Sequence, residues 1–248
     1  MLSIEFEDAK NWIELLEAIR DIVEEAFFIA TPEGLSLRAM DSARVAMIDL
    51  KLPPPYFSNY NIDKEEVKIG FSVSDMVKVL KGMRKGYKLA LEVGDENVIK
   101  LRFMGKGYHT FEFPLLDIEG ESIPSLKLKF DVRIKIETKV LMDAVENVEK
   151  FSDYATFKVE SKKFVIYGKS EKGRATSEFS KEDLIELQME KEAISSYSTE
   201  YLLNILGKDD LSEITVLEFA TKVPLKVTYN LVNEGELTYY LAPRTEVE

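Results

Sequence analysis

The chain has 248 residues, of which 45% are hydrophobic and 31% charged, so it is long enough for two domains with apolar cores. No apolar run approaches the ~20 residues of a membrane span, and the acidic N-terminus lacks a leader pattern, so we expect a protein of the cell interior. The absence of cysteine excludes disulfides and thiolate metal sites. A net charge of −12 disfavours general nucleic-acid binding but permits a local basic surface.

The first predicted element is an amphipathic helix within residues 8–25. Its apolar side chains recur at helical spacing, from Trp12 to Val23. The opposite face mixes Lys10, Glu14, Glu17 and Arg20. Such a mixture is what any solvated helix shows, so it assigns no function by itself.

A second helix is predicted from the Ser-rich start at residues 72–74. It opens a run without acids, from residue 76 to 91, and we place Lys78, Lys81 and Lys85 on one helical face. Basic runs are usually solvated faces. A nucleic-acid surface is the rarer alternative, and without interleaved aromatics it would contact the nucleic-acid backbone and not stacked bases.

The strand pairs predicted after the helices of each half are 89–93 with 98–103 and 214–219 with 225–229.

The sequence offers little material for catalysis. It has one histidine, His109, in the alternating segment 107–113, and no phosphate-loop or dinucleotide motif. Acidic pairs such as Asp183 with Glu186, or Glu24 with Glu25, are expected by chance among 45 acids. Asp41 is best read as a turn cap. We therefore predict no active site, no metal and no cofactor.

An internal repeat organises the chain. With a shift of 129 residues Lys10 matches Lys139, Leu16 matches Val145 and Phe28 matches Phe157, while residues 71–82 resemble 197–208. The segment 116–126 between the halves has linker composition. We predict an α+β protein of two similar domains, at 1–116 and 127–248, joined by a connector at 117–126. Each domain has two helices and eight or nine strands.

The sequence resembles the proliferating cell nuclear antigen family, most closely its archaeal members, from end to end. The segments that carry the resemblance are LLEAIRDIVEEAFF at 15–28, GLSLRAMDSARVAMIDLKLP at 34–53, SDMVKVLKG at 74–82, SIP at 122–124, VPLKV at 223–227 and TYYLAPR at 238–244. The resemblance implies a DNA clamp fold, with helices packed on antiparallel sheets. It also implies a trimeric head-to-tail ring that encircles duplex DNA without sequence preference.

Such a ring would use the basic helix faces as its inner wall. The resemblance assigns to the DNA-facing surface Lys10, Arg20, Lys78, Lys81, Lys139 and Lys208. The chain departs from the family pattern at Ile13, Glu14 and Glu146, where basic residues are common, so the hole is expected to be less positive than usual.

Clients of these clamps dock a short motif, containing a Gln and paired aromatics, into an apolar pocket beneath the connector. The matching positions are Met40, Ser42, Arg44, Val45, Met47, Ile123, Pro124, Leu126, Pro224, Tyr240, Ala242 and Pro243. Without the resemblance, Met40, Val45 and Tyr240 would be read as core residues.

The ring joint is expected to pair the edge segment 107–113 with segment 173–179 of the neighbour. The residues assigned to it are Arg84, Tyr108, His109, Phe111, Asp143, Glu146, Arg174 and Thr176, with Lys85 as an alternative to Arg84.

The resemblance implies a non-enzymatic polymerase processivity factor. Its partners would be double-stranded DNA, polymerase, clamp loader, flap endonuclease and ligase clients, and other clamp subunits, with no membrane. We expect a cytoplasmic, DNA-associated archaeal protein, or a nuclear one in a eukaryote. One alternative is a subunit of a heterotrimeric or checkpoint-type clamp. A second, of another class, is an acidic α+β enzyme that uses carboxylates.

Overall fold

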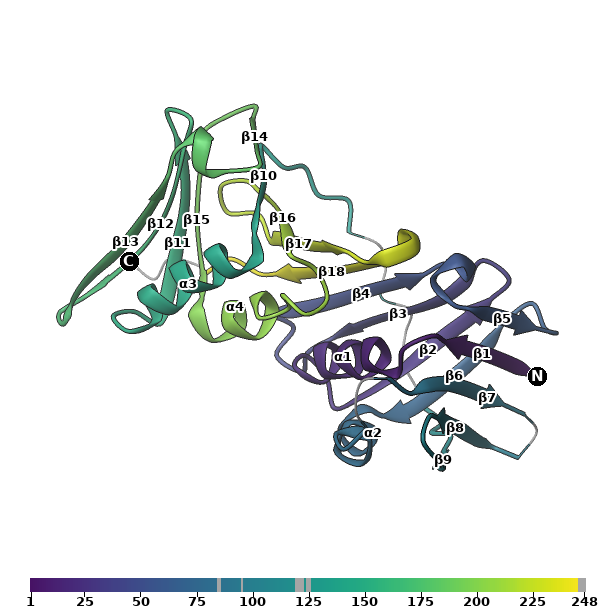
Figure 1. The fold of residues 1–248 in the computed structure, drawn as a ribbon. Coiled ribbons are helices and arrows are strands. Elements are labelled where there is room, and N and C mark those ends of the chain that lie inside the picture. Colours follow the sequence, from purple (N-terminus) through teal and green to yellow (C-terminus); the bar gives the residue numbers. More distant parts are fainter. Residues whose placement is uncertain (84–85, 95, 119–122, 124–125, 245–248) are drawn as a thin grey trace. The chain divides into compact units, whose positions relative to one another are not determined.

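The computed structural model describes all residues except 84–85, 95, 119–122, 124–125 and 245–248. The chain divides into two compact units (Figure 1). The first unit contains Met1–Ser42, Ile48–Ile123 and Leu231–Leu237, and the second contains Ala43–Met47, Pro124–Asn230 and Thr238–Glu248. Two short segments, 43–47 and 231–237, thus belong to a different unit from their sequence neighbours.

The elements up to residue 114 alternate single helices with groups of strands. They are β1 (Leu2–Phe6), α1 (Ala9–Arg20), β2 (Glu25–Thr31), β3 (Gly34–Met40), β4 (Ala46–Leu52), the 3-10 helix η1 (Pro54–Tyr56), β5 (Asn59–Ile62), β6 (Val67–Ser72), α2 (Val73–Leu80), β7 (Lys88–Val93), β8 (Val98–Met104) and β9 (Tyr108–Pro114).

The remaining elements repeat this order, with one additional 3-10 helix before the last strand. They are β10 (Val132–Glu137), α3 (Thr138–Glu149), β11 (Tyr154–Glu160), β12 (Lys163–Ser170), β13 (Gly173–Phe179), η2 (Lys181–Asp183), β14 (Glu186–Met189), β15 (Ala193–Ser198), α4 (Thr199–Leu206), β16 (Ile214–Phe219), β17 (Leu225–Asn230), η3 (Val232–Glu234) and β18 (Glu236–Leu241).

The repeat in the sequence is confirmed as a repeat of elements. Helices α1 and α3 have 12 residues each, and α2 and α4 have eight each. The predicted strand pairs are also confirmed, because β7 pairs with β8 and β16 pairs with β17, both antiparallel.

The first unit has a five-stranded sheet in the order β5-β1-β7-β8-β9, and strands β4, β3, β2 and β6 lie in that order in another sheet. Helices α1 and α2 pack on each other, and α2 also packs on β2 and β6. The core beneath them is aromatic. Trp12 of α1 is fully buried, with ring centroids 5.1 Å from Phe6 and 5.3 Å from Phe28.

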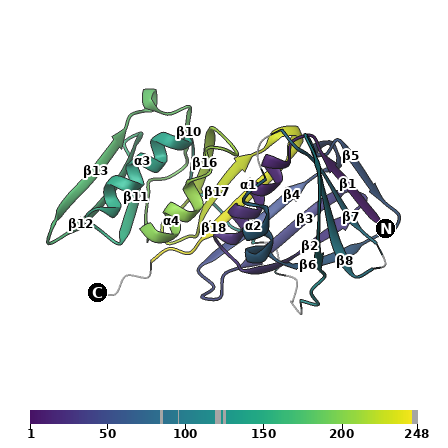
Figure 2. The ribbon, with the colours of Figure 1, turned by 60° about the horizontal axis from the view of Figure 1, so that its bottom comes forward.

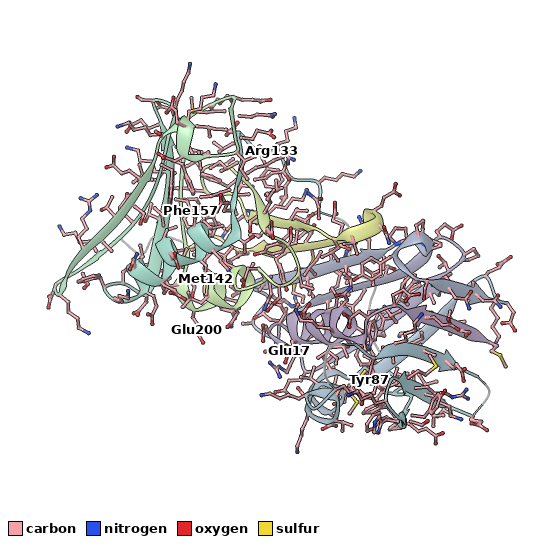
Figure 3. All side chains as sticks on the ribbon, in the orientation of Figure 1. Glu17, Tyr87, Arg133, Met142, Phe157 and Glu200 are labelled. Atoms are coloured by element: carbon pink, nitrogen blue, oxygen red, sulfur yellow. The ribbon has the colours of Figure 1, made fainter. Side chains whose placement is uncertain are left out.

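The second unit has a four-stranded sheet in the order β13-β12-β11-β15, and strands β14, β10, β16, β17 and β18 lie in that order in another sheet. Helices α3 and α4 lie side by side (Figure 2) and α3 covers β11 and β12. Phe157, labelled in Figure 3, is the aromatic centre of this core, because its ring contacts Phe164, Tyr197 and Phe219.

One sequence expectation about the second helix is wrong. Helix α2 begins where the Ser72 hydroxyl accepts from Asp75 N at 3.2 Å, and it ends at Leu80 with Lys81 as its C-cap. Strand β7 then starts at Lys88. The basic run is therefore not one helical face, because only Lys78 and Lys81 belong to the helix and its cap. Lys85 lies outside the described residues.

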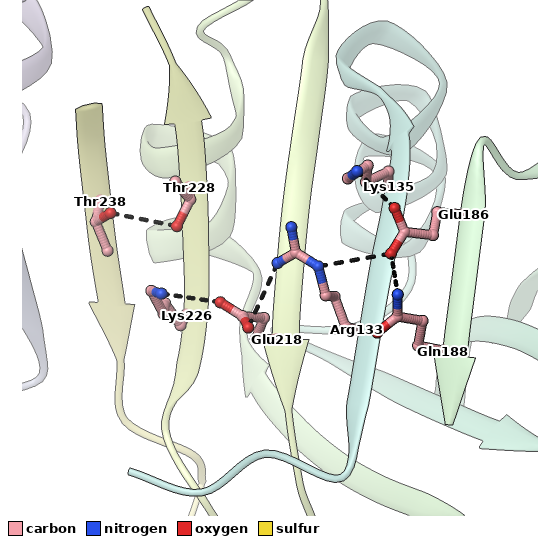
Figure 4. A network of polar contacts seen from close by, with 8 residues as sticks. All are labelled: Arg133, Lys135, Glu186, Gln188, Glu218, Lys226, Thr228 and Thr238. Atoms are coloured by element: carbon pink, nitrogen blue, oxygen red, sulfur yellow. Dashed lines mark hydrogen bonds and ion pairs between the residues drawn. The ribbon is translucent and has the colours of Figure 1, made fainter. Parts of the chain in front are cut away.

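A charged network covers the solvent-facing side of β14, β10, β16 and β17 (Figure 4). Lys135 pairs with Glu186 at 2.5 Å, and Lys226 pairs with Glu218 at 2.9 Å. Arg133 lies between the two acids, 3.7 Å from Glu186 and 3.4 Å from Glu218. Cross-strand pairs of opposite charge favour this strand register.

Candidate functional site

The polar faces of α1 and α2 hold basic side chains in different electrostatic settings. Lys10 pairs with Glu14 at 2.6 Å, and Arg20 lies 3.7 Å from Asp21. Lys78 and Lys81 are exposed, and neither forms an ion pair within the described part of the chain. Ile13, one of the departures from the family pattern, is buried. Of the four predicted DNA-facing residues in this unit, Lys78 and Lys81 therefore have the charges most available to a ligand.

The polar faces of α3 and α4 are richer in acid. Lys139 is exposed but lies 3.4 Å from Asp209, while Lys208 is half-buried in the turn after α4. Asp143, Glu146 and Glu200 are all exposed. Glu200 is labelled on α4 in Figure 3. Among the described residues, the acids of this face thus leave the charge of Lys139 less available to a ligand than the charges of Lys78 and Lys81.

The two strands expected at the ring joint are both outermost in their sheets, β9 in one and β13 in the other. On β9 Tyr108 is 85% exposed, His109 meets the Tyr87 ring edge-on at 5.7 Å, and Phe111 packs on Phe103. Each outermost strand has backbone groups on its outer side that another strand can pair with.

Strand β13 presents a polar outer face. Its Arg174 Nε donates to Thr176 Oγ1 at 3.0 Å and the guanidinium lies over the Tyr167 ring. Asp143 and Glu146 are exposed on α3, whereas Arg84 lies outside the described residues.

The residues assigned to the client pocket lie in four chain segments. In the second unit Ala242 N donates to Val45 O at 2.8 Å, which brings the loop before β4 together with the segment after β18. Arg44 in that loop has a left-handed φ of 58° and is exposed. Met47 is buried and Leu126 is exposed. The other second-unit members are half-buried, namely Val45, Pro224, Tyr240, Ala242 and Pro243.

The first unit contributes Met40, Ser42 and Ile123 to the same assignment. Met40 and Ile123 are half-buried, and Ser42 is exposed. Met40, Val45 and Tyr240 are therefore less enclosed than core residues. Pro124 lies outside the described residues.

Sequence reasoning missed a polar contact that holds the connector. Arg38 on β3 pairs with Asp49 on β4 and also donates from NH1 to the Ile123 carbonyl at 2.9 Å. A signal was present in the alternation of β3, because Leu35 and Leu37 are buried on one face and Arg38 therefore faces the other. The sequence pattern did not predict the partners of Arg38, because Asp49 is 11 and Ile123 is 85 residues away along the chain.

Two of the acidic side chains weighed as catalytic candidates, Asp183 and Glu186, have structural partners. Asp183 accepts from the Ser180 hydroxyl and backbone, which lowers the pKa of its carboxyl. The pKa of Glu186 is lowered mainly by its hydrogen bond from Lys135. Asp41 is half-buried directly after β3, while Glu24 and Glu25 are exposed before and at the start of β2.

One hollow of about 570 Å³ does gather acids, namely Glu137, Asp209, Asp210 and Glu213, around Lys139. These carboxylates are exposed, and the described residues contain no cluster of His, Cys, Asp or Glu suited to a metal. None of the helices in the described part of the chain is both long and apolar enough to cross a membrane.

Comparisons with known proteins agree on one family. The N-terminal domain of proliferating cell nuclear antigen matches residues 1–121 and its C-terminal domain matches residues 124–244. The chain is 37% identical over 249 residues to a DNA polymerase sliding clamp of Thermofilum pendens, covering 99% of this chain and 100% of that one. It is 35% identical over 248 residues to a DNA polymerase sliding clamp of Thermococcus gammatolerans, covering 98% of each.

Solved structures agree with this assignment. The crystal structure of the antigen from Thermococcus kodakaraensis matches with a TM-score of 0.94 at 28% identity, over 98% of this chain and 100% of that one. A PCNA2-PCNA3 complex from Sulfolobus tokodaii matches with a TM-score of 0.90 at 33% identity, over 98% of this chain and 100% of that one. The chain therefore belongs to the proliferating cell nuclear antigen family of DNA polymerase sliding clamps.

Proposed function

We propose that three subunits of this kind close head to tail into a ring around duplex DNA and act as a polymerase processivity factor. The observation that carries the proposal is the match of both halves to the family's two domains. The two outermost strands β9 and β13 support it, because a head-to-tail ring pairs such edges between subunits. The domains are 1–116 and 127–248, with the connector at 117–126.

The DNA-facing surface of the ring is formed by the six basic residues assigned from the family resemblance. Lys78 and Lys81 make the largest contribution, because their ammonium groups are exposed and no acid of the described chain pairs with them. Lys139 contributes less, because Asp209 lies 3.4 Å from it. Contacts of this kind go to phosphates, carry no sequence preference and weaken as salt rises.

The ring also serves as a docking platform. Polymerase, clamp loader, flap endonuclease and ligase clients insert an aromatic-containing peptide motif into the pocket that the resemblance assigns beneath the connector. The protein itself performs no catalysis and uses no cofactor, and it acts in the cytoplasm on chromosomal DNA.

The proposal is tested by native mass spectrometry together with polymerase assays on a primed DNA circle. We expect three times the 28.4 kDa subunit mass and longer products when the ring is loaded. A stable monomer that no related chain recruits would refute the ring. A second candidate is a mixed ring, which is favoured by the likeness to the Sulfolobus tokodaii PCNA2-PCNA3 complex. It predicts a trimer only after paralogous chains are added.

The docking pocket is tested by Tyr240→Ala. Tyr240 is half-buried on β18, so part of its side chain is accessible to a ligand. Aromatic residues of this kind supply much of the binding energy in peptide pockets, so we expect a loss of affinity of at least about tenfold. Fluorescence anisotropy with a labelled client-type peptide measures the loss, and native mass spectrometry checks the ring. Unchanged peptide affinity would remove Tyr240 from the site.

A further inference from the structure

Each unit carries a lysine at the same point of its first helix. Lys10 is the second residue of α1, and Lys139 is the second residue of α3. They are separated by the 129-residue shift of the internal repeat. Their side chains are 40% and 78% exposed, respectively. The repeat therefore presents an accessible cation at equivalent helical positions of the two units.

Each of these lysines pairs with an acid, and the two acids come from different elements. Lys10 Nζ lies 2.6 Å from Glu14 Oε1, one turn later on α1. Lys139 Nζ lies 3.4 Å from Asp209 Oδ2, in the turn after α4. The repeat does not relate the two acids, because the position equivalent to Glu14 is residue 143. The pairing therefore recurs at the lysine although the source of the acid differs.

Both acids keep negative charge close to the lysine ammonium group. The Glu14 side chain is only 11% exposed, so its carboxylate has little room to move away from α1. Asp209 lines the hollow of about 570 Å³ around Lys139, together with Glu137, Asp210 and Glu213. A carboxylate within a few ångströms repels an approaching phosphate, because salt screens charges only beyond about 10 Å at 0.1 M.

We propose that Glu14 and Asp209 limit the affinity of the clamp for DNA, because they compete with phosphate for Lys10 and Lys139. This inference rests on the proposed DNA-facing surface and adds to it a role for two acids. A phosphate that binds either lysine must displace or approach a carboxylate, so the contact is weaker than one to an unmasked lysine. Weak contacts to phosphate exchange readily and let a protein move along the duplex.

The test compares Glu14→Gln and Asp209→Asn with Glu160→Gln, and each variant removes one negative charge per subunit. Glu160 is the matched control, because it pairs with Lys158 at 2.6 Å on the face of β11 opposite to the buried Phe157. The probe is a labelled linear duplex of arbitrary sequence. Its binding to the assembled protein is measured by fluorescence anisotropy at several salt concentrations.

We expect Glu14→Gln and Asp209→Asn each to raise the affinity for the duplex by about threefold or more at low salt. Each phosphate contact that is gained should steepen the slope of log affinity against log salt by about 0.9. Adding Lys10→Gln to Glu14→Gln should abolish the gain, because the carboxylate then has no cation to mask. Glu160→Gln should leave both the affinity and the slope close to those of the unaltered protein.

Several outcomes would overturn the inference. Unchanged affinity in a folded variant removes the role from the acid that it replaces. Gains no larger than that of Glu160→Gln would show that only the net charge matters. A purely structural role for Glu14 would lower the melting temperature of Glu14→Gln without steepening the salt slope. If Glu14→Gln does not fold, Asp209→Asn still decides the question, because Asp209 is 41% exposed in a turn.

A separate variant tests the DNA-facing surface on which the inference rests. Lys78→Gln should weaken duplex binding, because Lys78 is exposed and no acid of the described chain pairs with it. If the unaltered protein binds no duplex at low salt, or if Lys78→Gln binds as tightly, the proposed surface itself fails. A normal loss in Lys78→Gln, with no gain in Glu14→Gln and Asp209→Asn, refutes only the role of the acids.

Discussion

At the scale of single residues, Trp12 shows how one side chain orders the first core. It is fully buried on α1 between Phe6 of β1 and Phe28 of β2, and Phe28 stacks in turn on Phe71 at 5.0 Å. Yet no described residue accepts a hydrogen bond from its indole Nε1. The residue therefore combines a large favourable burial with an unsatisfied donor.

This combination predicts different outcomes for two substitutions of Trp12. Trp12→Ala should lower the free energy of unfolding by about 3–5 kcal/mol, because it leaves a cavity in an aromatic core. Trp12→Phe should cost less than about 1.5 kcal/mol, because the lost ring area is offset by removal of the unsatisfied N–H. Urea unfolding measures both. Equal costs for the two variants would contradict the role given to the indole nitrogen.

At the scale of elements, the Glu186 carboxylate connects β14 to β10 through Lys135. The hydrogen bond from Lys135 holds the pKa of Glu186 below its ordinary value of 4.5. A carboxyl whose pKa is lower in the folded than in the unfolded chain stabilises the fold above the unfolded pKa. That stabilisation disappears as the pH falls through the folded pKa.

We therefore expect Glu186→Gln to lower the melting temperature near neutral pH. The difference from the unaltered protein should shrink as the pH falls from the unfolded pKa of Glu186 through its lower folded pKa, below which the carboxyl is protonated in both states. Glu182→Gln is the control, because Glu182 is exposed in η2 and pairs with no base of the described chain. Thermal melting at several pH values measures both. A pH-independent difference for Glu186→Gln would show that the ion pair is not its cause.

At the scale of the whole molecule, the proposed ring would close through the outer edges of two sheets. The five-stranded sheet has β5 at one edge and β9 at the other, and only β9 is assigned to the joint. The two edges therefore provide a matched pair of positions. Thr110 is exposed on β9, and Asn61 is exposed on β5.

Thr110→Arg should weaken the trimer, because it adds a positive charge to the strand expected to meet Arg174 on β13 of the neighbour. Asn61→Arg adds the same charge at the opposite edge and should leave the trimer intact. Sedimentation velocity over a dilution series, at low and moderate salt, measures the fraction of trimer. Equal weakening by both variants would mean that the joint does not use β9 specifically.

The sequence alone determined the parts that depend on local periodicity. Helical spacing around Trp12, alternation in the strands and the shift of 129 residues predicted two similar α+β halves, and the elements of the structure repeat in that way. The sequence-based prediction was wrong about where the second helix ends. The basic composition of the run after Met76 continues past Leu80, which is the last residue of α2.

Only the tertiary structure decided which charges are paired and which are available. Lys139 and Lys78 were both predicted to be DNA-facing lysines. In the fold, Asp209 lies beside Lys139, whereas no described acid lies beside Lys78. The contact between Arg38 and Ile123 spans 85 residues, so no spacing rule could have predicted it. The physical reason is that an ion pair or hydrogen bond acts over a few ångströms in space, whereas sequence periodicity reports only neighbours along the chain.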